Sequence, residues 1–297
     1  MALRASFARS VDPRLIGIGL ALVATLLFSG LDTTAKVLGQ SLPPLEVAWF
    51  RYAINVLFVV LMLRPWRRPE LFGTRRPALQ ILRGLFLMGS TVLNFAALRY
   101  LQLTEAASIQ FAGPLIVTAL AGPLLGERIG WRRWAAVVVG LLGVLVVIRP
   151  GLGGMHWAAF LSLGSTSCYA LYLIMTRHLG RTESAEGMLL ISAVVGMAAI
   201  TPLLPPVWQT PSGATVWVML AGLGLFGGIA HFLLIHAHKL TPASTLAPFS
   251  YTLILWMTAL GYIVFGDLPD VWTVVGGAII VASGLYTLHR ERLRRDP

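Results

Sequence analysis

Long apolar segments, separated by short polar ones, make up almost the whole chain. Each is about 20 residues long, and a helix rising 1.5 Å per residue needs about that length to cross a hydrocarbon layer of roughly 30 Å. The ten predicted spans are residues 15–35, 45–63, 78–98, 104–125, 131–148, 155–175, 187–205, 214–235, 242–265 and 271–288. Clusters of proline and glycine between them mark loops where a helix cannot continue. The pattern predicts an all-α membrane protein with ten transmembrane helices.

The first span follows three arginines, as the apolar core of a signal peptide does. Arg4, Arg9 and Arg14 precede it. The apolar stretch is long, and no small-residue cleavage site follows its core. We therefore expect a membrane helix here.

Composition and charge agree with a membrane protein. Hydrophobic residues make up 57% of the chain and charged residues 12%, against about 45–50% and about 25% in soluble domains. The net charge of +11 raises nucleic-acid binding as an alternative. However, 18 of the 23 Lys and Arg residues fall at the termini and in alternate loops, and only Lys36, Arg99 and Arg149 fall in the opposite loops. Because positive loops stay inside, both termini are expected in the cytoplasm, and no nucleic-acid partner is needed.

The chain has the pattern of a duplication. The hairpin Leu103–Gly143 returns as Leu240–Gly284, each opening with Leu-Thr-x-Ala and carrying a proline in its first helix. We predict two five-helix units, residues 1–149 and 150–297. Since five is an odd number, the second unit must enter the membrane from the other side, so the repeats are inverted. Inverted repeats are typical of secondary transporters.

Several motifs together resemble one family. They are Trp49-Phe50-Arg51-Tyr52, Arg83-Gly84, Ala96-Ala97-Leu98-Arg99-Tyr100, Ala112-Gly113-Pro114, Leu125-Gly126-Glu127-Arg128 and Gly140-Leu141-Leu142-Gly143. The set is similar to the EamA pattern of the drug/metabolite transporter superfamily. The resemblance implies a five-plus-five inverted-repeat carrier of small metabolites, commonly an exporter in the bacterial inner membrane. One departure is Asp267, where the family usually has glutamate.

Equivalent positions of the two repeats are the first candidates for a substrate site on the seam between them. Asn94 and His231 form such a pair, each polar among apolar neighbours. We expect both to face a shared cavity. The alternative is that each only bonds a neighbouring helix.

Two prolines mark further candidates. Pro114 and Pro248 each remove a helical hydrogen bond to the carbonyl four residues earlier, and a freed carbonyl needs protein or a watery cavity to satisfy it. Gln110 shares a helical face with Pro114, as Ser244 and Tyr251 do with Pro248. We expect these faces to line the substrate path. Simple kinks for packing are the alternative.

Trp256 is the one tryptophan in the middle of a predicted span, and Tyr169 and Tyr172 lie in the middle of another. Trp256 and Tyr169 could stack on a flat or apolar substrate, or could pack against lipid or other helices.

Charges inside the bilayer usually pair or line a polar interior. Asp32 and Arg51 lie at similar depths, so a gating or coupling pair is one hypothesis and a structural ion pair near the interface is the other. Arg83 lies within snorkelling reach of the cytoplasmic surface, which predicts an anchor.

The motifs of common enzymes and pumps are missing. His231, His236 and His238 share a helix that carries no carboxylate, and no Gly-x-Ser-x-Gly, His-Glu-x-x-His or phosphate loop occurs. An intramembrane enzyme is therefore disfavoured, and so is a channel, which would need a charged ring or a carbonyl filter. We expect no cofactor and no metal, with transport driven by an ion gradient or by the substrate's own gradient.

The expected cavity suits a zwitterion with an apolar side chain. Together with the family resemblance, which implies export, this gives the hypothesis of an exporter of amino acids with aromatic or other apolar side chains, with a multidrug or lipophilic-cation efflux carrier as the alternative. The expected partners are a small-molecule substrate and the lipid bilayer. Monomer and homodimer are both left open.

Overall fold

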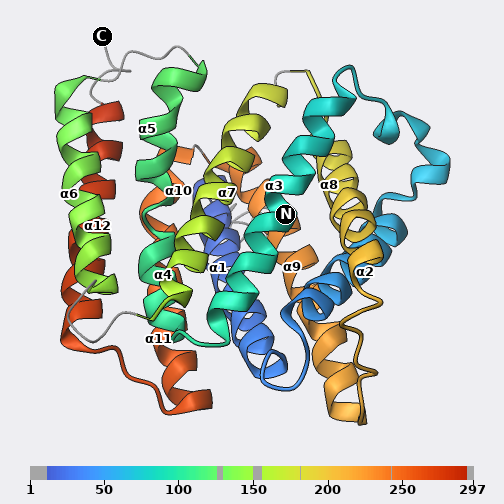
Figure 1. Cartoon of the computed structure of the whole chain (residues 1–297). Coiled ribbons are helices and arrows are strands. Elements are labelled where there is room, and N and C mark those ends of the chain that lie inside the picture. Colours follow the sequence, from blue (N-terminus) through green and yellow to red (C-terminus); the bar gives the residue numbers. More distant parts are fainter. Residues whose placement is uncertain (1–11, 126–129, 150–155, 181, 242, 293–297) are drawn as a thin grey trace, which may run out of the picture.

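The protein is an assembly of helices in every part of the chain that the structure describes. The computed structural model describes residues 12–125, 130–149, 156–180, 182–241 and 243–292, and these ranges contain no strand. Figure 1 shows the helices standing side by side as a bundle. They are α1 (Pro13–Leu38), α2 (Pro44–Leu63), η1 (Pro65–Arg67), η2 (Pro69–Phe72), α3 (Pro77–Leu98), α4 (Leu103–Gln110), α5 (Gly113–Leu125), α6 (Trp131–Ile148), α7 (Ala158–Leu179), α8 (Ala185–Ile200), η3 (Thr201–Leu203), α9 (Ala214–Leu240), α10 (Ala243–Ser250), α11 (Thr252–Phe265) and α12 (Val271–Arg292).

Helix starts follow the local sequence. Proline is the first residue of α1, α2 and α3, where its fixed φ suits a helix and its missing N–H costs nothing. Asp12 caps α1 by accepting a hydrogen bond from the Arg14 N–H at 2.9 Å, and Ser184 caps α8 through the Gly187 N–H at 3.1 Å. The predicted boundaries are therefore close to the observed ones.

Two of the ten predicted spans are not continuous helices. Residues 104–125 divide into α4 and α5, and residues 242–265 divide into α10 and α11. The first break lies just before Pro114, whereas Pro248 lies inside α10 and the second break follows it. Each break therefore lies within a few residues of the proline in that span, but only the first lies directly at it.

Length and apolarity mark most of these helices as able to cross a membrane. Eight spans in the described part qualify, and the stretches Trp134–Ile148 and Val271–Thr287 are shorter apolar helices. The protein is thus a multi-pass membrane protein. The count of ten crossings and the cytoplasmic placement of both termini stay predictions.

Three helix pairs make the most extensive contacts. They are α1 with α9, α3 with α7, and α6 with α12. Each of these pairs joins a helix before residue 150 to one after it. In Figure 1 α6 and α12 lie next to each other at one side of the bundle and run in opposite directions. Their backbones touch, because a Cβ on Gly276 would lie only 2.6 Å from the Gly143 carbonyl oxygen.

Helix α4 lies deep in this arrangement. Leu103, Ala106, Ala107 and Ile109 have no exposed surface, and the helix contacts α7 and α11 as well as α12. Its last residue, Gln110, therefore lies in the interior of the bundle.

Candidate functional site

A chain of hydrogen bonds links three of the predicted residues. Asn94 on α3 donates from Nδ2 to Asp32 Oδ1 on α1 at 3.0 Å, and its Oδ1 accepts from Gln110 Nε2 on α4 at 2.8 Å. Asp32 and Asn94 are buried, while Gln110 is half-buried. Three residues chosen from separate sequence arguments are thus brought together, and Asn94 holds the centre.

Arg51, on α2, is buried beside Thr91, which lies about one helical turn before Asn94 on α3. It donates from Nη1 to Thr91 Oγ1, and the Tyr52 hydroxyl lies 3.0 Å from the same oxygen. The Arg51 guanidinium lies 5.1 Å from the centre of the Tyr52 ring, while its Nε has no hydrogen-bond partner.

The expected ion pair between Asp32 and Arg51 does not form. In the part of the chain that the structure describes, each uses a different residue of α3 instead, Asn94 for Asp32 and Thr91 for Arg51. Thr91 was missed from the sequence. Its position three residues before Asn94, on a neighbouring helical face, was the available signal.

Aromatic side chains lie beside this polar chain. Half-buried His231 on α9 meets Phe28 of α1 edge to face, with ring centres 5.0 Å apart. Phe28 lies one turn before Asp32 on the same face of α1. Tyr169 stacks on Tyr172 of the same helix, α7, at 5.6 Å, and both are half-buried.

The remaining predicted residues are placed differently. Pro114 and Pro248 are exposed. Tyr251 packs its ring 4.8 Å from Phe111, and its hydroxyl fills the space where a Cβ on Gly284 would stand. Trp256 is half-buried on α11 and its Nε1 has no partner. The side chain of Ser244 lies outside the described residues.

The prediction that Arg83 snorkels to the surface as an anchor is wrong. Arg83 is 1% exposed. It donates to Thr176 of α7 at 3.1 Å, to Ser192 of α8 at 2.6 Å and to the Met188 carbonyl. Its depth along α3 suggested the surface, but the turn of the helix points it at two neighbouring helices. Arg83 therefore joins three helices.

Ion pairs link helix ends at one end of the bundle. Lys36 of α1 lies 3.5 Å from Asp267, and Arg149 lies 2.7 Å from Asp270. Burial of Asp270 raises the pKa of its carboxyl, but the Thr273 N–H and Arg149 outweigh this effect, so the pKa is lowered. Both pairs join a residue before position 150 to one after it.

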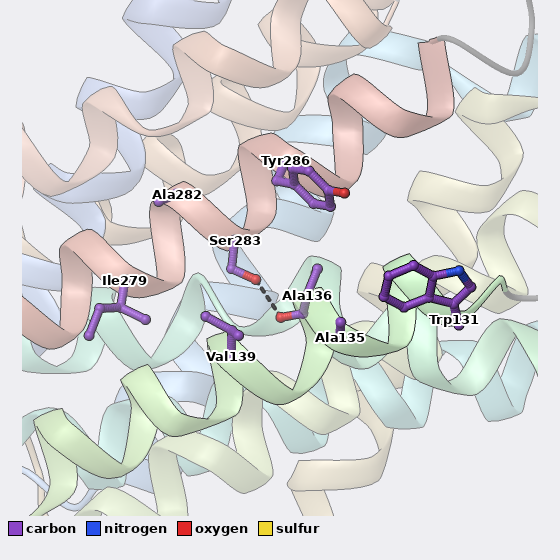
Figure 2. Close-up of a pocket in the computed structure, with 8 residues that line it drawn as sticks. All are labelled: Trp131, Ala135, Ala136, Val139, Ile279, Ala282, Ser283 and Tyr286. Carbon is purple, nitrogen blue, oxygen red and sulfur yellow. Dashed lines mark hydrogen bonds between the residues drawn. The ribbon is translucent and has the colours of Figure 1, made fainter.

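Two apolar grooves open elsewhere. Figure 2 shows one of about 460 Å³ between α6 and α12, lined by Trp131, Ala135, Ala136, Val139, Ile279, Ala282, Ser283 and Tyr286. The Ser283 hydroxyl there already donates to the Ala136 carbonyl. The other, of about 360 Å³, is lined by residues of α2 and α9 such as Phe58 and Leu225. Neither groove includes a predicted site residue, and neither offers a charged group to a zwitterion.

No metal centre emerges from the described helices. Among the residues that the structure describes, no three His, Cys, Asp or Glu side chains come together to hold an ion. The chemistry available at the polar chain is recognition by charge, amide and aromatic groups.

Comparison with known proteins places this arrangement in a family. The model of the EamA-like transporter family matches residues 15–149 and again residues 156–288. A crystal structure with 22% sequence identity covers 95% of this chain and 98% of its own at a TM-score of 0.59, so the two proteins share a fold.

Similar curated proteins are named as transporters. The S-adenosylmethionine uptake transporter of Rickettsia felis is 30% identical over 278 residues, which are 94% of each chain. The riboflavin transporter of Vibrio cholerae is 28% identical, covering 91% of this chain and 92% of its own. The pseudopaline exporter of Pseudomonas aeruginosa is 25% identical, covering 90% and 94%. The chain is a membrane transporter and belongs to the EamA-like transporter family of the drug/metabolite transporter superfamily.

Proposed function

We propose that this protein is a secondary transporter in the bacterial inner membrane that exports amino acids with aromatic or other apolar side chains, and related small metabolites, by alternating access. The observation that carries the proposal is the hydrogen-bonded chain Asp32–Asn94–Gln110, in which the acid and the first amide are buried and the second amide is half-buried. A membrane protein rarely places an acid and two amides among its packed helices without a use for them.

Alternating access is supported by how the two halves pack. If α1, α2 and α3 correspond to α7, α8 and α9, then the α1–α9 contact is the counterpart of the α3–α7 contact. Under the same correspondence α6 matches α12, and these two helices run antiparallel. We propose residues 1–149 and 150–297 as the two inverted units, which exchange conformations about a central site.

The substrate class is argued from the groups that converge. Asn94 and Gln110 offer amides, His231 offers an imidazole, and Phe28 adds a ring beside the acid. Asn94 and His231 are equivalent positions of the two repeats. Lys36-Val37-Leu38-Gly39 after the first span also matches Arg177-His178-Leu179-Gly180 after the sixth, and the same offset of 141 residues pairs Phe28 with Tyr169. Polar groups at one end and rings beside them suit an amino acid with an apolar side chain. We therefore assign Asn94, Gln110, His231 and Tyr169 to the substrate.

The other predicted residues complete the proposed substrate path. Trp256, with its unbonded Nε1, is a further candidate contact. Pro114, Pro248, Ser244 and Tyr251 are proposed to shape the substrate path through the two helix breaks.

A second candidate substrate comes from the relatives. The Rickettsia felis protein is named for S-adenosylmethionine uptake, and that molecule is itself an amino acid with a cationic sulfonium. Buried Asp32 gives a cation a partner. Uptake and export are both represented among the relatives' names, so direction is part of what the experiment must measure.

The test is transport by the purified protein in liposomes. Labelled phenylalanine, leucine and S-adenosylmethionine are offered separately, alongside a lipophilic cationic dye, with protein-free liposomes as the control. We expect transport of the two amino acids and inhibition of each by the other. Transport of the dye without any amino acid would refute the proposal, and transport of S-adenosylmethionine alone would replace it with the second candidate. Inside-out and right-side-out vesicles then report direction.

A further inference from the structure

Two opposite charges are buried close to the same stretch of α3 without forming an ion pair with each other. Asp32 is 7% exposed and Arg51 is 6% exposed. Neither forms an ion pair with any residue that the structure describes. Their polar partners are uncharged, Asn94 for the acid and Thr91 for the base. A buried charge without a direct ion-pair partner is costly, so such a group is a candidate contact for a ligand of opposite charge.

The contacts around these charges close into a ring. Thr91 and Asn94 are three residues apart on α3 and therefore neighbours on its surface. On its other side, the Arg51 side chain lies close to α9. A Cβ added to Gly227 of α9 would be 3.6 Å from the Arg51 Nε. Gly227 lies one turn before His231 on the same helix.

His231 closes the ring of contacts, because it leads back to α1, the helix that carries Asp32. It contacts Phe28, which lies one turn before Asp32 on α1. The ring thus passes through α1, α3, α2 and α9 and carries one acid, one base and two aromatic groups.

One orphaned group points to the missing ligand. The Arg51 Nε–H is buried and has no acceptor. Donors on a guanidinium fork match the two oxygens of a carboxylate. An incoming carboxylate would satisfy this N–H and neutralise the arginine.

We propose that Asp32 and Arg51 form the head-group site for an α-amino acid. The substrate ammonium donates to the Asp32 carboxylate, and the substrate carboxylate accepts from the Arg51 guanidinium. The inference rests on the proposed function, and it changes the role of this pair from gate or structural ion pair to substrate recognition. Phe28 and His231 then lie on the acid's side of the site, next to the substrate.

The first test uses the wild-type protein and three compounds that share one ring. Phenylalanine carries both charges, phenethylamine lacks the carboxylate, and 3-phenylpropionate lacks the ammonium. A buried charge-assisted contact contributes enough to change affinity about ten-fold or more. We expect each one-charge compound to compete with labelled phenylalanine at least about ten-fold more weakly than unlabelled phenylalanine does. Equal competition by all three would overturn the proposal without affecting the claim that phenylalanine is transported.

The second test assigns each charge to its residue. With Arg51→Gln, phenylalanine should lose its advantage over phenethylamine but keep its advantage over 3-phenylpropionate. With Asp32→Asn, phenylalanine should lose its advantage over 3-phenylpropionate but keep its advantage over phenethylamine. Each ratio is measured within one protein sample, so it does not depend on how much protein folds. Arg67→Gln and Glu70→Gln remove charges at exposed positions and should leave both ratios unchanged.

The outcomes separate the two claims. If wild type transports no amino acid, the proposed function fails and this site fails with it. If wild type transports phenylalanine and both variants keep the wild-type ratios, the head-group site alone is refuted. Thermal unfolding provides a further check: removal of an uncompensated charge should leave the melting temperature unchanged or higher, whereas loss of a structural charge should lower it.

Discussion

Replacement of Asn94 by alanine tests the polar chain most directly. The change removes the donor to Asp32 and the acceptor for Gln110, at 3.0 and 2.8 Å. A buried group left without its partner costs about 1–3 kcal/mol, and more when it is charged. Two groups lose partners here, so the free energy of unfolding should fall by about 2–6 kcal/mol. A water molecule entering the vacated space would recover part of that loss, which places the expected value at about 2–3 kcal/mol.

Asn55 supplies a matched control. It is 4% exposed, but its Oδ1 has no hydrogen-bond partner. Asn55→Ala therefore deletes the same atoms without breaking a bond at that oxygen. We would measure unfolding of both variants in mixed detergent micelles, and uptake of labelled phenylalanine by both in liposomes.

Two results would refute the reasoning. Equal destabilisation by Asn94→Ala and Asn55→Ala would mean that the hydrogen bonds of Asn94 contribute nothing. Wild-type affinity for phenylalanine in Asn94→Ala would remove this residue from the substrate site. We expect both Asn94→Ala and His231→Ala to raise the KM for phenylalanine while the protein still inserts into the membrane, because His231 is the position in the second unit that is equivalent to Asn94.

Three further predictions follow from packing and charge. Arg83→Met removes the guanidinium that donates to the Thr176 and Ser192 hydroxyls and to the Met188 carbonyl, so the free energy of unfolding should fall by about 2–5 kcal/mol; an unchanged melting temperature would contradict this. Gly276→Val forces a Cβ against the Gly143 carbonyl and should abolish a stably folded protein on gel filtration, whereas Gly19→Ala, with open space around it, should not. The pKa of Asp270 is lowered in the folded protein, so its ionised carboxylate stabilises the fold above the unfolded pKa of 3.8, and this stabilisation is lost as the pH falls below that value. The free energies of unfolding of wild type and Asp270→Asn should therefore differ above about pH 4 and converge in acid.

Hydrophobic patterning was enough to predict the helices, because a span of apolar residues and a flanking proline act locally. It was also enough to choose Asn94, which is polar among apolar neighbours, and Gln110, which shares a helical face with Pro114. The bond between them could not be derived, because it depends on how α4 packs against α3, and sequence separation says nothing about that distance.

Charged residues show where sequence reasoning stops. Arg83 and Arg51 were judged by depth in the bilayer alone, which is a coordinate along the helix. Their partners depend on the direction around the helix and on which neighbour lies there. Arg83 accordingly joins α7 and α8, and Arg51 bonds Thr91 in preference to Asp32.

The contact between Gly143 and Gly276 leaves two backbones touching with no side chain between them. A junction of this kind has no side chains that could change rotamer to let the two helices slide, so we expect it to act as a pivot. Any rocking of one half of the protein against the other is then expected to turn about this point, with the largest displacements at the far side of the bundle, where α2 and α8 lie.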